Sequence, residues 1–134
     1  MFGFRKKKNV PLFIRAKDVA SIIQSDYRDG VAFCLIEFQL NGKLYTMGSV
    51  LLPNQEERQE NIYFVFDGKR YDTYEEFIQN AVVNDIRLLD TDTIIEVVRA
   101  GIIDGEPMIQ TPWGDTRLAK MAIQKGDHFP FPGK

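Results

Sequence analysis

Cysteine and histidine are almost absent from this 134-residue chain, which contains one of each, Cys34 and His128. Because a single cysteine cannot form a disulfide within the chain, the sequence is typical of a reducing compartment and predicts a cytoplasmic protein. One thiol and one imidazole are too few for the nitrogen and sulfur ligands of an ordinary zinc site. We therefore predict no metal, and His128, close to the C-terminus, is badly placed for a Cys-His or Ser-His-Asp catalytic arrangement.

Long apolar runs and glycine-rich phosphate loops are also missing. No stretch of about 18 apolar residues is present, so the sequence predicts no transmembrane segment. The glycines show neither the P-loop nor the dinucleotide-binding spacing, and we therefore predict no nucleotide or other cofactor. Near the N-terminus, the apolar stretch is too short for the hydrophobic region of a signal peptide.

Charge is distributed unevenly along the chain, although the net charge is only −2. Residues 1–17 contain six Lys or Arg and no acid, whereas residues 18–134 contain eleven bases and nineteen acids. This acidic body argues against nucleic-acid binding, since proteins of that class carry their basic excess on the folded face. Residues 1–9 are predicted to form a flexible basic leader, with weak peripheral contact to an anionic membrane as the alternative. The basic residues of the leader are Arg5, Lys6, Lys7 and Lys8.

The N-terminal half contains one helical pattern followed by strand patterns. Apolar residues at helical spacing predict a helix over Ala16 to Tyr27, followed by a glycine that can end it. Alternating apolar residues predict strands over Val31 to Leu40 and Lys43 to Leu52, with Cys34 on the core-facing side of the first. Asn41-Gly42 between them is a strong signal for a tight hairpin turn.

A second hairpin follows a polar and acidic segment, residues 53–60, which predicts an exposed loop. Its first strand is predicted over Asn61 to Asp67, and its short second strand over Lys69 to Asp72. Asp67-Gly68 is a second tight-turn signal and joins the two strands. The sequence thus predicts three or four antiparallel strands that follow one another along the chain.

The C-terminal half contains signals for three helices. Thr73-Tyr74-Glu75-Glu76 is a capping box that starts a helix predicted to end near Asn84. Thr93 to Glu96 repeats the capping-box pattern and predicts a second helix, ended by Gly101. The last helix is predicted over Thr116 to Gln124.

These elements predict one α+β domain over residues 10–124, followed by a tail over residues 125–134. Its fold class is an antiparallel three- to four-stranded meander, covered on one face by the N-terminal helix and the C-terminal helices. Residues 102–109 add a small hairpin, in which Pro107 lacks a donor and confines its strand to a sheet edge. As an alternative architecture, the first three strands curl into a partial barrel that bends at Gly48.

Two segments have the composition of recognition elements. In Pro112 to Arg117, the only tryptophan stands in a turn beside the predicted N-cap of the last helix, and tryptophan and arginine often dominate interface energetics. In Phe129 to Pro132, two prolines restrict the backbone and two aromatic rings suit a groove on a neighbouring protein. The structural alternative is a place in the protein's own core for the first segment and in a tail for the second. The predicted binding residues are Trp113, Asp115, Arg117, Phe129 and Phe131.

Carboxylates are the remaining groups that suit catalysis or metal binding. Asp85, Asp90 and Asp92 share one region of the chain, and Asp104 and Glu106 share another, as in a magnesium-dependent hydrolase. Helix capping and turn formation explain the same residues without a metal. A small-ligand pocket over the sheet is a further alternative. Its predicted lining residues are Glu37, Tyr45, Tyr63, Arg70 and Tyr71.

The sequence favours a non-catalytic protein-binding module over an enzyme, because carboxylates are the only candidates for a general base. An acidic body suits a basic protein partner, as in an inhibitor or an immunity-type protein. The same size and charge suit a subunit of an assembly or a homo-oligomer. The alternative function is a small metal-dependent hydrolase or a small-ligand-binding domain that uses its carboxylates.

Overall fold

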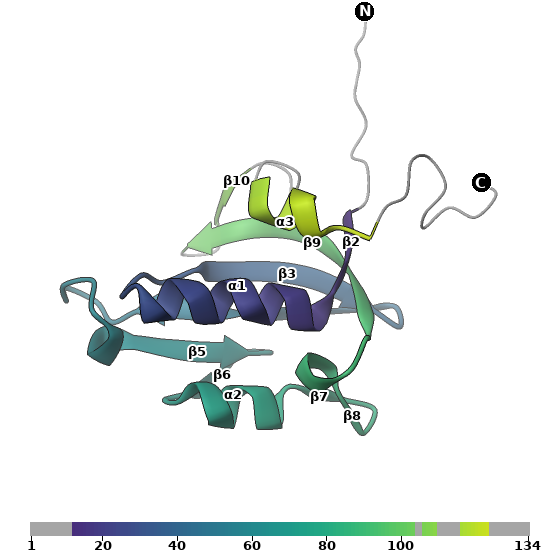
Figure 1. Cartoon of the computed structure of the whole chain (residues 1–134), viewed down its shortest axis with the longest axis horizontal. Helices are drawn as coiled ribbons and strands as arrows, with labels where there is room; N and C mark the ends of the chain where they lie inside the picture. Colours follow the sequence, from purple (N-terminus) through teal and green to yellow (C-terminus); the bar gives the residue numbers. More distant parts are fainter. Residues whose placement is uncertain (1–11, 104–105, 110–115, 124–134) are drawn as a thin grey trace, which may run out of the picture.

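Seven strands form one antiparallel sheet in the computed structural model, which describes residues 12–103, 106–109 and 116–123 (Figure 1). The strand order is β10-β9-β3-β4-β5-β6; β2 pairs with the first half of β9, and β10 pairs with its second half. The strands are β2 (Leu12–Arg15), β3 (Cys34–Leu40), β4 (Lys43–Leu51), β5 (Ile62–Phe66), β6 (Lys69–Tyr71), β9 (Ile94–Ile103) and β10 (Glu106–Ile109).

Helices cover one face of this sheet, as the sequence predicted. Figure 1 shows α1 lying across the sheet, with α2 and α3 on either side of it. Buried residues of all three helices belong to the same apolar cluster as the inward side chains of β3, β4 and β5. The helices are α1 (Ala16–Arg28), α2 (Tyr74–Asn80) and α3 (Thr116–Met121), with short 3-10 turns η1 (Gln59–Asn61) and η2 (Leu88–Asp90) and a separate hairpin of β7 (Val82–Val83) and β8 (Ile86–Arg87).

The meander from β3 to β6 confirms the two predicted hairpins. Asn41 and Gly42 have φ values of 53° and 80°, and Asp67 and Gly68 have values of 52° and 82°. Two consecutive residues with positive φ are what a type I′ turn requires, and its twist matches that of the flanking strands. Each turn therefore sets the register of its strand pair, with Leu40 opposite Lys43 in the first.

β9 corrects the prediction of a helix that starts at the second capping-box pattern. Residues 94–103 form the longest strand of the sheet and pair with β3 on one side and with β2 and β10 on the other. The segment is rich in β-branched residues, which fit a pleated sheet better than a helix. Ile95 and Val97 alternate into the core, and both are almost fully buried. The sheet is consequently wider than the predicted three- to four-stranded meander.

Gly101 is an irregularity within β9 and not the end of a helix. It has a φ of 66° and lies between Ala100 and Ile102, whose β3 partners Ile36 and Leu35 are direct neighbours in the chain. The extra residue is a β-bulge, in which glycine readily adopts the positive φ. A glycine with a positive φ can end a helix, but at Gly101 the same backbone conformation forms a bulge in a strand.

α2 is shorter than predicted. Its start is confirmed, because the Thr73 hydroxyl accepts a hydrogen bond from the Glu76 amide at 3.1 Å. The helix ends at Asn80, however, and Asn84 does not terminate it. Asn84 and Asp85 have φ values of 52° and 67° and form the turn between β7 and β8. The Asn84-Asp85 pair thus forms a hairpin turn and does not end a helix.

The core lies between the sheet and the helices. Phe38 from β3, Phe64 from β5 and Phe77 from α2 are fully buried, and the rings of Phe64 and Phe77 stack with centroids 5.5 Å apart. Burial of each such side chain contributes about 2 to 3 kcal/mol to folding. Ile23 on α1 and Leu118 on α3 are also fully buried, so α1 and α3 are held to the same core.

Gly48 permits a close backbone contact. A Cβ atom at Gly48 would lie 1.8 Å from the carbonyl oxygen of Cys34, a distance that no side chain can accept. Cys34 itself has a φ of 76°, and β3 begins there and not at Val31 as predicted. The sheet is open, with β10 and β6 at the two ends of its strand order. Gly48 suggested a bend into a partial barrel, but its close contact with Cys34 explains why glycine is present there.

None of the helices formed by the described residues is long and apolar enough to span a membrane. The leader over residues 1–9 and the tail over residues 125–134 lie outside the described ranges. The proposed boundaries of the domain therefore stay predictions. α3 is confirmed as the predicted last helix, although it ends at Met121.

Candidate recognition surfaces

Arg117 is the only predicted binding residue within the part of the chain that the structure describes. It lies in the first turn of α3, the helix that sequence periodicity indicated. Its role in binding stays a prediction. The other predicted binding residues lie outside the described ranges, as do the basic residues Arg5 to Lys8. These other binding residues are Trp113, Asp115, Phe129 and Phe131.

Arg117 joins α3 to the C-terminal half of α1. Its Nη1 donates a hydrogen bond to the Asp26 carboxylate at 2.7 Å, and its guanidinium carbon lies 5.7 Å from the centre of the Phe33 ring. The Asp26 side chain is only 16% exposed, whereas that of Arg117 is 48% exposed. Partial burial of the carboxylate reduces screening by water, so this pair is worth more than an ion pair in open solvent.

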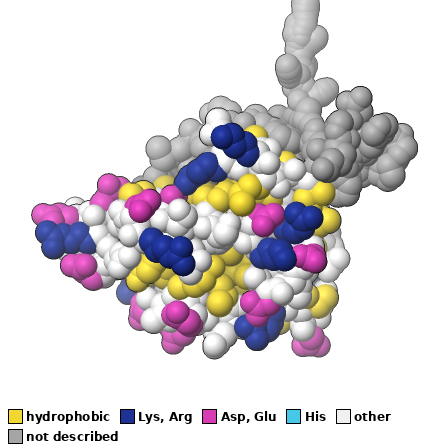
Figure 2. Space-filling model, viewed as in Figure 1, with side chains coloured by type: hydrophobic (Ala, Val, Ile, Leu, Met, Phe, Trp, Pro, Cys, Tyr) yellow, Lys and Arg dark blue, Asp and Glu magenta, His cyan; other side chains and the backbone are white. Residues whose placement is uncertain are grey.

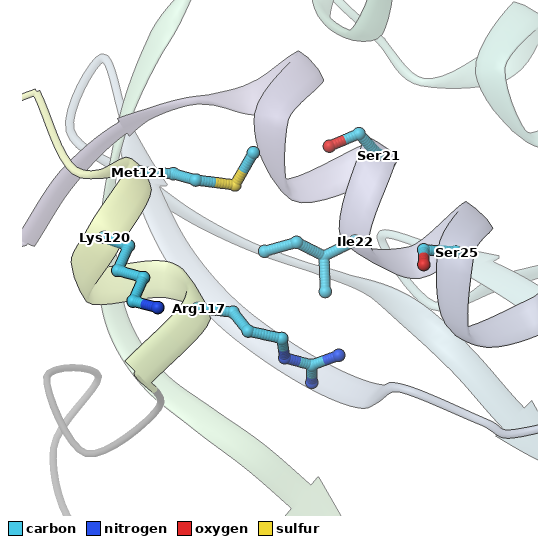
Figure 3. A pocket seen from close by; sticks show the side chains of 6 residues that line it. All are labelled: Ser21, Ile22, Ser25, Arg117, Lys120 and Met121. Carbon is cyan, nitrogen blue, oxygen red and sulfur yellow. The ribbon is translucent and has the colours of Figure 1, made fainter.

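A groove of about 320 Å³ lies between α1 and α3 (Figure 3). We call it the α1–α3 groove. Among the described residues, its wall contains two basic side chains, two hydroxyls and two apolar side chains, and no carboxylate. The residues that line it are Ser21, Ile22, Ser25, Arg117, Lys120 and Met121.

The polar groups of the groove differ in how they are already engaged. The Ser21 hydroxyl donates to the Asp18 carbonyl oxygen at 2.7 Å. The Ser25 hydroxyl has no hydrogen-bond partner, and the Lys120 ammonium has no ion-pair partner, among the described residues. Both groups are exposed, so an incoming ligand reaches them without first breaking a contact.

A second surface, which we call the acidic end, combines the end of α1 with the loop before β5. The loop is fixed to the helix because Gln59 Nε2 donates to the Arg28 carbonyl oxygen at 3.2 Å. Arg58 forms ion pairs within the loop, and in Figure 2 acidic and basic side chains gather on one protruding part of the molecule. The acidic end consists of Asp29, Glu56, Glu57 and Glu60, all of which are exposed.

Two of the four carboxylates in the acidic end form no ion pair with a described residue. Arg58 pairs with Glu56 at 2.8 Å and lies 3.8 Å from Glu60. Asp29 and Glu57 form no ion pair with any other described residue. Residues 53–60 are exposed, which confirms the predicted exposed loop. The loop ends in the single 3-10 turn η1.

The half-buried thiol of Cys34 lies close enough to the acidic end to respond to its negative potential. Burial raises the pKa of the Cys34 thiol above its ordinary value, and the charges of Asp26 and Glu57 raise this pKa further. A thiol with a raised pKa is a poor nucleophile at neutral pH because little thiolate is present.

The carboxylates that suggested a metal-dependent hydrolase do not gather. Asp90 pairs with Arg87, and Asp92 pairs with Lys17 at 2.6 Å. Asp85 lies in the turn between β7 and β8. Among the described residues, no group of three or more His, Cys, Asp or Glu is arranged to hold a metal ion. Asp104 lies outside these residues, and for Glu106 the structure describes only the strand.

The predicted lining of a pocket over the sheet is wrong, because its residues lie on opposite faces. Tyr45 packs against the core, with its ring stacked 5.5 Å from that of Phe38. Tyr71 packs against the same core. Strand alternation places the other three, Glu37, Tyr63 and Arg70, on the face opposite the helices, where they make separate contacts. Glu37 forms an ion pair with Arg99 at 3.1 Å. The guanidinium carbon of Arg70 lies 4.4 Å from the centre of the Tyr63 ring.

The groove residues other than Arg117 were not identified from the sequence. Ser21 and Ser25 are four positions apart, which places them on one face of a helix. That spacing is a visible signal for a shared polar face. The contact of α3 with this face includes the ion pair of Arg117 with Asp26, which are 91 positions apart, and no local pattern indicates it.

Comparison of the chain with protein-family models, with curated proteins and with solved structures gives no match.

Proposed function

We propose that the protein is a non-catalytic protein-binding module whose acidic end recognises a basic surface on a protein partner. The observation that carries this proposal is the pair of exposed carboxylates, Asp29 and Glu57, that have no counter-ion among the described residues. A partner that supplies Lys or Arg would neutralise them without disrupting an existing ion pair. An inhibitor, an immunity-type protein or a subunit of an assembly fits this mode of binding.

The rigidity of the acidic end supports the same role. Gln59 holds the loop to the last turn of α1, and Asn61 Nδ2 donates to the Glu56 carbonyl oxygen at 2.9 Å. A charged surface that is fixed before binding loses less conformational entropy when the complex forms. Complementary charge at such a surface increases the association rate and the specificity more than the raw affinity. We therefore expect binding to weaken strongly as salt rises.

The partner is sought with the tagged full-length chain in a lysate of its source organism at low and at high salt, with captured proteins identified by mass spectrometry. The test variant is Asp29→Lys/Glu57→Lys, which reverses two charges without removing an ion pair. The control is Glu75→Lys/Glu76→Lys, which makes the same change in net charge at the exposed start of α2. We expect one stoichiometric, salt-sensitive partner that the test variant loses and the control retains.

The affinity of the purified partner then gives the size of the effect. An exposed ion pair contributes about 0.2 to 1 kcal/mol, and reversal replaces attraction with repulsion, so the test variant should bind about tenfold more weakly. Equal affinity for the test and control variants would contradict the proposal, as would the absence of any partner at low salt. The single cysteine makes the reducing cytoplasm the compartment in which we expect the complex.

A further inference from the structure

The α1–α3 groove is separate from the acidic end and has the opposite charge. Its volume of about 320 Å³ is at the lower end of the range for small-molecule sites. Figure 3 shows Ile22 between the side chains of the two helices, with the serine hydroxyls and the basic groups around it. The groove thus combines an apolar centre with polar groups on its wall, which is the usual composition of a ligand site.

The charges in the groove favour a ligand with one negative charge. Asp26 already neutralises Arg117 and holds its guanidinium at the wall, at 2.7 Å. Lys120 supplies one further positive charge, which no described carboxylate balances. One net positive charge matches a carboxylate better than a doubly charged phosphate group.

The apolar side chains determine the rest of the ligand. Ile22 is only 5% exposed, and Met121 is partly buried against the core. Methionine is flexible and adapts to apolar ligands of varied shape. A hydrocarbon stem would pack mainly against Met121, because Ile22 has little surface left to bury.

We propose that the α1–α3 groove binds the carboxylate of a small amphipathic molecule. The Lys120 ammonium binds the carboxylate, and Met121 contacts the apolar stem. Arg117 contributes positive potential and holds the two helices together, and the site does not need its guanidinium to be unpaired. This site is independent of the protein partner proposed above.

Octanoate is the probe, titrated into the full-length chain while backbone amide and Met121 methyl signals are recorded by NMR. We expect saturable shifts at Ser25, Lys120 and Met121 in the millimolar range. The exposed Lys120 ammonium is screened by water, so Lys120→Gln should weaken binding about two- to fivefold. Lys69→Gln is the matched control, because Lys69 is also exposed and unpaired among the described residues, and it should leave binding unchanged.

Three results would overturn the proposal. The first is the absence of saturable shifts at the groove. The second is equal weakening by Lys120→Gln and Lys69→Gln, or equally tight binding of octylamine, which has the same stem and the opposite charge. The third is a set of contacts from the Met121 methyl to the rings of Phe129 or Phe131 in the ligand-free chain, because the groove would then be occupied by the protein's own C-terminal segment.

Discussion

The carbonyl oxygen of Cys34 occupies the space in which a side chain at Gly48 would begin, 1.8 Å from the position of its Cβ. The two residues lie on neighbouring strands, β3 and β4, in the centre of the sheet. Cys34 adopts a positive φ there, which brings its carbonyl toward the glycine. β3 begins at this contact.

Gly48→Ala should destabilise the protein by about 2 to 3 kcal/mol, because the neighbouring backbone must move to admit a methyl group. Gly42→Ala is the control: no atom lies within 4 Å of the added Cβ, and the cost comes only from the positive φ. That cost is about 1 kcal/mol. Urea unfolding measures both variants, and an equal loss of stability in the two would contradict the proposed close contact.

Ser49→Ala should cost about 1 to 3 kcal/mol, since it leaves a buried donor without an acceptor. Ser49 is fully buried, and its hydroxyl oxygen accepts a hydrogen bond from the Phe33 amide at 2.7 Å. Ser25→Ala removes an exposed hydroxyl and should change the free energy of unfolding by less than about 0.5 kcal/mol. Thermal and urea unfolding of the two variants provide the comparison; similar stabilities would argue against this role of Ser49.

The ion pair between Arg117 and Asp26 should contribute a coupling energy of about 0.5 to 1 kcal/mol in a double-mutant cycle. The matched pair is Arg58 and Glu56, at 2.8 Å, whose side chains are 60% and 76% exposed. Solvent screens this second pair more strongly, so its coupling energy should be close to zero. If the two cycles give the same value, partial burial of Asp26 has no energetic effect.

Stability should decrease with rising pH once the pH exceeds the ordinary pKa of a thiol. The folded state raises the pKa of Cys34, so between the unfolded and folded values the unfolded chain loses its proton first. Ionisation then favours unfolding, and the contribution is lost as the pH rises through the folded pKa. Cys34→Ala should remove this part of the pH dependence, measured by urea unfolding in alkaline buffers. An unchanged profile in the variant would show that another group is responsible.

Alkylation of the thiol tests the causes of the raised pKa separately. Glu57→Gln should lower the pKa of Cys34 only in part, because burial is the larger cause. The pH dependence of the reaction with iodoacetamide reports this change as a shift toward lower pH. A pKa that does not change on removal of the Glu57 charge would contradict the negative potential inferred for the acidic end.

The elements that the sequence predicted well are those decided by neighbouring residues. Asn41-Gly42 and Asp67-Gly68 specify turns that require a positive φ at two consecutive residues. Thr73 caps α2 by accepting a hydrogen bond from the amide of Glu76, three positions away. β9 was wrongly predicted as a helix because its first residues match a capping box and Gly101 matches a helix end. Pairing with β3, about 60 positions earlier in the chain, decides its conformation, and tertiary context of this kind overrides local propensity.

The candidate surfaces follow the same division. Composition indicated that the loop over residues 53–60 is exposed and acidic, and the structure agrees. The α1–α3 groove needs two helices that are distant in the sequence to pack on one core through residues such as Ile23 and Leu118, and the sequence alone contains no sign of that packing. The wrong pocket over the sheet arose because aromatic and charged residues were grouped without their strand alternation, which separates Tyr45 from Tyr63.

The most direct test of the acidic end is the salt dependence of the affinity between the full-length chain and its purified protein partner. If Asp29 and Glu57 meet basic side chains, the Kd should rise steeply with salt, and Asp29→Lys/Glu57→Lys should weaken binding at low salt by about tenfold. The same variant should also make the salt dependence shallower, because fewer charge contacts remain to be screened. A Kd that responds neither to salt nor to this variant would contradict recognition through the acidic end.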